Sequence, residues 1–154
     1  MSLSRVRAIK VPPYSVHSEK VVLGSMIAEP KLIAPLKEVI ERGETFFRIE
    51  HARIFDALIE VQSKQQPTTT DELMHALDAH EAMERLGGES LLRELARDAS
   101  DPGAVDGQAR VVAEKAKMRQ LIEVISDSLN DAYYSGEDYT AVLERTRARL
   151  VELG

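Results

Sequence analysis

Histidines are the first candidates for metal binding or acid–base chemistry in this chain, and there are four of them, at positions 17, 51, 75 and 80. His75 and His80 are five residues apart, about 140° around a helix, so their rings cannot converge on one ion. His51 falls on an apolar helical face, where a buried histidine with a hydrogen-bond partner is commoner than a ligand. His17 is expected in a first helical turn, facing solvent. We therefore expect no metal site.

Nucleotide chemistry by the P-loop route needs two glycines five residues apart, followed by Lys and then Ser or Thr, so that backbone N–H groups can hold phosphates. None of the eight glycines has that spacing, and no glycine precedes a lysine. Gly87-Gly88 follows a helical pattern and is interpreted as a helix stop. The absence of cysteine excludes thiolate ligands, disulfides and cysteine nucleophiles.

Serines and carboxylates complete the search for catalytic groups. No serine occupies the strand-to-helix elbow of a serine hydrolase. The carboxylates Glu81, Glu84, Asp98 and Asp101 are spread over predicted helix ends and solvated faces. No catalytic residue is singled out, so the chain is expected not to be an enzyme. An enzyme with an unrecognised carboxylate site is kept as a third alternative.

Charge and hydropathy narrow the class of protein further. The formal net charge is -6, and an acidic balance disfavours autonomous binding to a phosphate backbone. No apolar run approaches the roughly 18 to 20 residues that span a bilayer. The first seven residues carry arginines but no apolar segment after them, so they are not a secretory signal. We expect a cytoplasmic protein without a membrane partner.

Helical periodicity and the positions of proline and glycine predict an all-α fold. The chain is expected to begin with a flexible N-terminal arm at residues 1–14 that ends at Pro12-Pro13. A compact helical head of about five helices follows at residues 15–100. Ser15 is a good N-cap for the first helix, and Thr69 with Glu72 forms a capping box for the fourth. Gly43 is expected to stop the second helix, which Pro35 should kink or shorten. The predicted core of the head consists of Leu23, Met26, Ile27, Phe46, Phe47, Ile54, Phe55, Leu58, Leu91, Leu92 and Leu95.

In residues 103–153 apolar residues recur every three or four positions along two long segments that are separated at Gly136. This pattern predicts a two-helix antiparallel hairpin. Its first arm would be roughly 40 Å long at 1.5 Å per residue. Two isolated helices bury few side chains completely, whereas ordering each residue costs about 1 to 2 kcal/mol of backbone entropy. The hairpin is therefore expected to pair with a second copy. The predicted oligomer interface consists of Val111, Met118, Ile122, Ile125, Leu129, Val142, Leu143 and Leu150.

The most basic region lies in the same hairpin. Arginines 110, 119, 145, 147 and 149 and lysines 115 and 117 could form a nucleic-acid surface. The preferred interpretation is a solvated face with ion pairs one helical turn apart to Glu114, Glu123 and Glu144.

Four ordered segments resemble the N-terminal domain of the bacterial replicative DNA helicase, the DnaB family. The first is a Pro-Pro turn followed by a helix with Glu19 and Val22-Leu23-Gly24, and the second is Phe46-Phe47 followed by His51 and Ile54-Phe55. The others are residues 86–95, with Gly-Gly and Leu-Leu-Arg-Glu-Leu, and residues 109–122, with Val-Val-Ala-Glu-Lys and Arg-Gln-Leu-Ile. Pro35 and the threonines at 68–70 depart from the family pattern.

The resemblance implies a collar and interaction domain that mediates subunit assembly and docks primase or a helicase loader during DNA replication. It implies a homo-oligomer, a dimer or a ring hexamer in the full-length protein, with weak or indirect contact to DNA. ATP and Mg²⁺ would belong to a RecA-like motor domain that this chain lacks, so no cofactor is expected here.

The alternative function is a helical DNA-binding regulator with a helix-turn-helix pair within residues 48–85. Its recognition helix would begin Asp71-Glu72-Leu73, which is too acidic to face phosphates comfortably.

Overall fold

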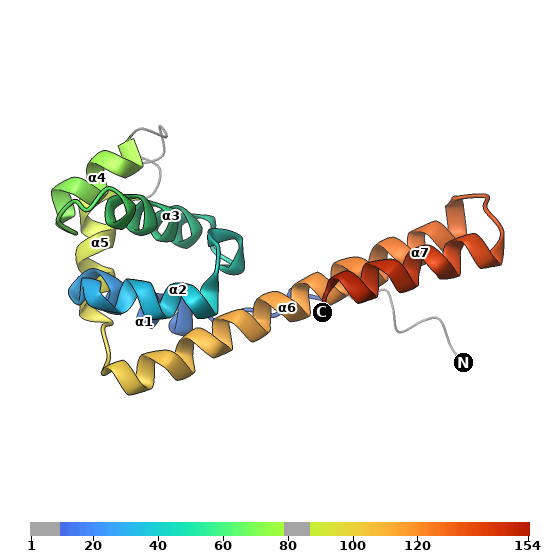
Figure 1. Cartoon of the computed structure of the whole chain (residues 1–154), viewed down its shortest axis with the longest axis horizontal. Coiled ribbons are helices and arrows are strands. Elements are labelled where there is room, and N and C mark those ends of the chain that lie inside the picture. Colours follow the sequence, from blue (N-terminus) through green and yellow to red (C-terminus); the bar gives the residue numbers. More distant parts are fainter. Residues whose placement is uncertain (1–9, 79–86) are drawn as a thin grey trace. The chain divides into compact units, whose positions relative to one another are not determined.

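The computed structural model describes residues 10–78 and 87–154, and every regular element within these ranges is helical. α-Helices and single-turn 3-10 helices alternate up to residue 63, and the α-helices that follow include the long α6 (Figure 1). The elements are α1 (Val16–Ala28), η2 (Pro30–Leu32), α2 (Ile33–Ile40), η3 (Gly43–Thr45), α3 (Ile49–Ser63), α4 (Thr70–Asp78), α5 (Gly88–Arg97), α6 (Pro102–Tyr134) and α7 (Tyr139–Glu152).

Local capping signals account for several helix boundaries. The Ser15 hydroxyl accepts a hydrogen bond from the backbone N–H of Ser18 at 3.3 Å, as expected of an N-cap. The Thr69 hydroxyl accepts in the same way from Glu72 N–H at the start of α4. Pro35 is the third residue of α2, where the backbone N–H has no partner within the helix in any case, so the ring costs no hydrogen bond.

The chain divides into two compact units, and α6 contributes to both. Among the described residues, one unit consists of residues 15–78 and 87–117, and the other of residues 10–14 and 118–154. The sequence interpretation ended the head at residue 100 and began the hairpin at 103, whereas the structure places the unit boundary after Lys117. The reason is that Val105, Ala109 and Val112 of α6 are at most 2% exposed and belong to the core of the head.

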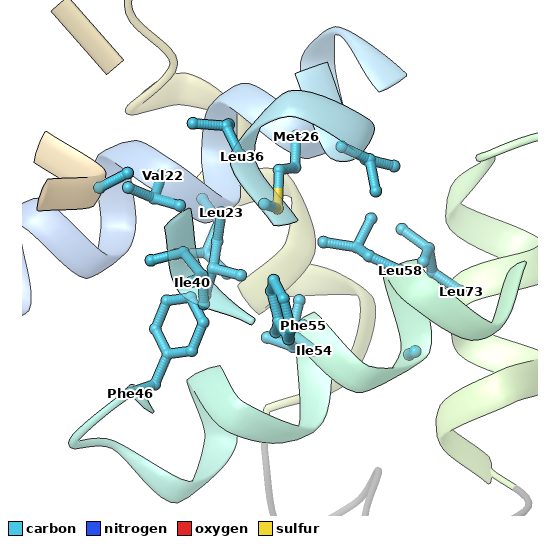
Figure 2. Packing of buried hydrophobic residues seen from close by; sticks show 14 of the residues in the cluster. Val22, Leu23, Met26, Leu36, Ile40, Phe46, Ile54, Phe55, Leu58 and Leu73 are labelled. Carbon is cyan, nitrogen blue, oxygen red and sulfur yellow. The ribbon is translucent and has the colours of Figure 1, made fainter. Parts of the chain in front are cut away.

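The core of the head lies between α1, α2, α3 and α5, with α4 packed on α3 and α5 (Figure 2). Of the predicted core residues, Leu23, Met26, Phe46, Ile54, Phe55, Leu58, Leu92 and Leu95 are at most 4% exposed. Ile27 and Leu91 are partly buried at its edge.

The prediction that Phe47 belongs to the core of the head is wrong, because Phe47 is 38% exposed. Phe46 has an extended backbone, and consecutive extended residues place their side chains on opposite sides. Phe46 turns inward, with its ring centroid 5.3 Å from that of Phe55. Phe47 therefore turns outward.

A buried carboxylate holds the loop that precedes α3. Glu19 of α1 is 1% exposed, and its Oε1 accepts a hydrogen bond from Phe47 N–H at 2.5 Å. Its Oε2 lies 2.6 Å from Nδ1 of His51, which is 3% exposed, and 3.4 Å from the backbone nitrogen of Arg48. A carboxylate is costly to bury unless it is hydrogen-bonded, so these contacts fix the loop against α1.

Glycines mark two close approaches of the backbone in the head. A Cβ on Gly24 would lie 2.0 Å from the carbonyl oxygen of Leu95, so α1 and α5 cross too closely for any side chain there. Gly43 does not end α2 as predicted, because α2 stops at Ile40 and Glu41 takes the positive φ of 64°. Gly43 instead begins η3, where a Cβ would meet Asp56 at 2.6 Å. The segment that Gly87-Gly88 is expected to end falls on residues 79–86, outside the described residues.

We predict that Gly24→Ala destabilises the chain by about 1 to 3 kcal/mol, because the backbone of α1 and α5 must separate to admit the methyl group. Urea unfolding followed by circular dichroism measures the change. Gly107→Ala is the matched control, since nothing lies within 4 Å of its Cβ position in α6. The control should gain about 0.5 to 1 kcal/mol. Equal stability of the two variants would contradict the close approach.

We predict that Glu19→Gln lowers the free energy of unfolding by about 1 to 3 kcal/mol, because an amide nitrogen would replace one of the two accepting oxygens. The control is Glu94→Gln, whose side chain is 61% exposed and pairs with Lys20 at 3.1 Å. An exposed pair contributes about 0 to 1 kcal/mol. A Glu19 variant no less stable than the Glu94 variant would show that the buried hydrogen bonds are dispensable.

Candidate protein-interaction surface

The hairpin unit is built from the second half of α6 and from α7, which lie side by side in Figure 1. The turn between them contains Gly136 at φ 70°, a conformation that favours glycine. Asp138 caps α7 by accepting from Ala141 N–H at 2.9 Å. The break expected at Gly136 is therefore present, and local chemistry explains it.

Ion pairs tie α7 to α6 across the hairpin. Asp131 of α6 accepts from Arg149 at 2.8 Å and from Arg145 at 3.3 Å. Arg145 also donates to Glu137 at 2.5 Å. The hydrogen bond from Arg149 is the main cause that lowers the pKa of Asp131, against the opposing effect of desolvation. The hydrogen bond to Glu137 is the main cause that raises the pKa of Arg145.

The inner face of α6 is narrow and only partly apolar. Leu121 and Val124 are half-buried, and Ser128 is 9% exposed. The Ser128 Oγ is buried without a hydrogen-bond partner among the described residues. From α7, Val142, Leu143 and Thr146 are half-buried. Few large apolar side chains are therefore buried between the two helices of the hairpin.

A second apolar stripe on α6 remains open to solvent. We call Met118, Ile122, Ile125 and Leu129 the open stripe. Their exposed fractions are 42%, 45%, 55% and 47%, and their spacing of four, three and four keeps them on one helical face. At 100° per residue the centre of this face lies about 100° around α6 from the centre of the inner residues Leu121, Val124 and Ser128. Covering one face thus leaves the other uncovered.

The other residues of the predicted interface have different positions. Leu150 of α7 is 42% exposed, whereas Val142 and Leu143 are half-buried within the hairpin. Val111 is 38% exposed but belongs to the unit that contains the head. The structure thus brings the four residues of the open stripe together and assigns the others to the hairpin interior, to α7 or to the other unit.

The basic residues of the hairpin region are mostly engaged by carboxylates, and only partly with the predicted partners. Arg147 pairs with Glu144 at 2.8 Å as predicted. Arg110 pairs instead with Asp106 at 2.9 Å, one turn earlier. The hydrogen bonds from Arg145 and Arg149 to Asp131 join residues 14 and 18 positions apart. Helical periodicity does not predict pairs at these separations. These pairings reduce the positive charge available to a phosphate backbone.

The histidines and carboxylates that were considered for catalysis or metal binding do not form a cluster in the described parts of the chain. His17 and His75 are exposed, and His51 is buried with Glu19. His80, Glu81 and Glu84 lie outside the described residues. Within residues 10–78 and 87–154, no three His, Asp or Glu side chains gather in a way that could hold a metal ion. No helix among these residues is long and apolar enough to cross a membrane.

The proposed recognition helix of the alternative function is α4. Its first turn carries Asp71 and Glu72, while Leu73 and Leu77 are at most 3% exposed and belong to the core. An acidic first turn is unfavourable next to phosphates.

Comparison with known proteins places this fold in a family. The family model described as "DnaB-like helicase N terminal domain" matches residues 11–114, which is more than half of the chain. The chain belongs to this family. Its all-helical head and hairpin are those of a DnaB-like helicase N-terminal domain, as the sequence resemblance indicated.

Individual relatives agree with this assignment. The chain is 29% identical over 151 residues to the replicative DNA helicase DnaB of Geobacillus stearothermophilus, covering 98% of this chain and 33% of the relative. It is 30% identical to the replicative DNA helicase DnaB of Rhodothermus marinus, covering 96% of this chain and 15% of the relative. The chain therefore spans a third or less of these two curated helicases.

Solved structures show the same fold. The N-terminal domain of DnaB helicase from Mycobacterium tuberculosis matches with a TM-score of 0.85 at 26% identity, covering 94% of this chain and all of that one. A DnaB-like replicative helicase, described with its interactions with primase, matches with a TM-score of 0.72 at 23% identity. It covers 91% of this chain and 32% of that chain, and at this identity it supports the fold alone.

We predict that Asp131→Asn destabilises the hairpin at neutral pH and that the difference from the parent chain disappears in acid. A carboxyl whose folded pKa is lowered stabilises the fold above its unfolded pKa, near 3.9, and loses that contribution as the pH falls through the folded value. Thermal unfolding from about pH 7 to pH 2.5 measures the effect. Asp127→Asn, an exposed carboxylate of the same helix, should show a smaller dependence. A difference that persists unchanged in acid would contradict the role of the carboxylate.

Proposed function

We propose that this DnaB-like domain serves as an assembly and docking domain of a replicative DNA helicase. The observation that carries the proposal is the open stripe, four apolar side chains on one helical face that are 42 to 55% exposed in the single chain. A contiguous exposed apolar face on a soluble domain marks an interaction site.

The partner that fits the open stripe best is the same stripe of a second copy. An apolar helical face that repeats every three to four residues is suited to pack against a like face in a helical bundle. A two-fold pair is self-complementary, so one surface supplies both sides of the interface. Burying the exposed half of each of the four side chains would contribute about 1 kcal/mol per side chain.

The docking part of the function is supported by the family. One structural neighbour is a DnaB-like replicative helicase that is described with its interactions with primase. We propose that primase or a helicase loader docks on this domain, that its contact with DNA is weak or indirect, and that it acts in the cytoplasm.

We also propose that the chain has no motor activity of its own. It lacks the P-loop spacing, and it spans only a third or less of two curated helicases that it resembles. ATP and Mg²⁺ would then be bound by a motor domain elsewhere in the helicase.

We predict that Ile122→Asp weakens self-association by at least about 100-fold, because an unpaired carboxylate would be buried in the stripe at a cost of several kcal/mol. Sedimentation equilibrium over a range of protein concentrations measures the effect. Val151→Asp is the matched control, since Val151 is 78% exposed on α7 and is not part of the stripe. A parent chain that sediments as a monomer at all concentrations would contradict the assembly role, as would an Ile122 variant that associates as the parent does.

A further inference from the structure

Three tyrosines surround the turn of the hairpin. Tyr133 and Tyr134 end α6, and Tyr139 begins α7, with exposed fractions of 62%, 79% and 78%. We call these three residues the tyrosine tip. The chain has only four tyrosines and three phenylalanines, and Phe46 and Phe55 are at most 4% exposed. The tip therefore exposes three of the seven aromatic side chains of this chain.

The tyrosine tip is held in place by an ordered turn. Glu137 N–H donates to the Ser135 hydroxyl at 3.3 Å, and Asp138 caps α7. Arg145 ties Glu137 to α7 at 2.5 Å. The rings of Tyr133 and Tyr134 lie with their centroids 5.8 Å apart at 40°. Rings displayed on a preorganised turn lose little conformational entropy when they bind.

The charge around the tyrosine tip is negative. Residues 120–144 include six aspartates and glutamates and neither lysine nor arginine. Arg145 and Arg149 reach back to Asp131 and Glu137. Asp138, next to Tyr139, and Asp127, about two helical turns before Tyr134, remain exposed. This charge repels the phosphates of nucleic acid and attracts cations, and the face of a tyrosine ring attracts Lys and Arg as well.

We propose that the tyrosine tip docks a Lys- or Arg-rich, partly apolar segment of a different protein. Exposed tyrosines supply contact area and polar hydroxyls, which is why they are enriched among the residues that dominate protein interfaces. The surrounding carboxylates select a basic partner by charge complementarity. At 100° per residue Tyr134 lies about 150° around α6 from the centre of the open stripe, whereas Tyr133 lies about 50° from it. Tyr134, which is substituted in the test below, therefore faces a different direction from the surface proposed for self-association.

This inference rests on the proposed docking function and gives it a location and a partner chemistry. It does not rest on self-association, because a second copy of the chain uses the open stripe. The two proposals can therefore fail separately: sedimentation of the Ile122 variant reports on the stripe, and peptide binding reports on the tip.

The test uses the full chain and two fluorescent peptides, one an amphipathic Lys/Leu helix and the other its Glu/Leu counterpart. Fluorescence anisotropy should show binding of the Lys/Leu peptide that weakens as salt is added. The double substitution Tyr134→Ser with Tyr139→Ser should weaken that binding by at least about tenfold, since each ring is a contact of the kind that dominates interfaces. Val151→Ser is the matched control, because Val151 is as exposed as Tyr139 and lies outside the tip.

Circular dichroism checks that the double variant remains folded, as expected for exposed positions. Unchanged peptide affinity in the double variant would overturn the proposal, and so would equal binding of the Glu/Leu peptide. Tighter binding of a single-stranded oligonucleotide at the tyrosines would overturn it in favour of nucleic acid. Loss of self-association in the double variant would overturn it in favour of a second copy.

Discussion

Helix α6 has more than one apolar face, and the described part of the chain does not cover all of them. The proposed assembly of this domain depends on that constraint. Its first part supplies Val105, Ala109 and Val112 to the core of the head, and its second part packs against α7. The open stripe, about 100° around the helix from the inner face, has no such cover among the described residues. A straight helix cannot turn both faces toward one neighbour, so the second face is available to another molecule.

Inside the head, a single carboxylate joins two segments that are distant in the sequence. Glu19 accepts hydrogen bonds from Phe47 and contacts His51, and all of these positions belong to the segments that resemble the family. A buried carboxylate has few acceptable environments, so this pairing constrains how α1 and α3 pack. The same arrangement turns Phe46 into the core and Phe47 outward.

Local signals made part of this structure predictable. Ser15, Thr69 and Asp138 cap helices through neighbours three residues away, and Gly136 breaks the hairpin where the turn needs a positive φ. Contacts between distant residues were not predictable in the same way. The burial of Glu19 and the pairing of two arginines with Asp131 depend on partners 14 or more positions away. The unit boundary after Lys117 was missed because one unbroken helical pattern crosses it.

The central claim is that a second copy covers the open stripe, and thiol labelling tests it directly because the natural chain has no cysteine. Ile125→Cys places one thiol within the stripe, and Val151→Cys places one at a residue outside it that is 78% exposed. If a second copy covers the stripe, labelling of the first thiol slows as the protein concentration rises, while labelling of the second does not change. Labelling of the Ile125→Cys thiol at the same rate at every concentration would contradict the claim.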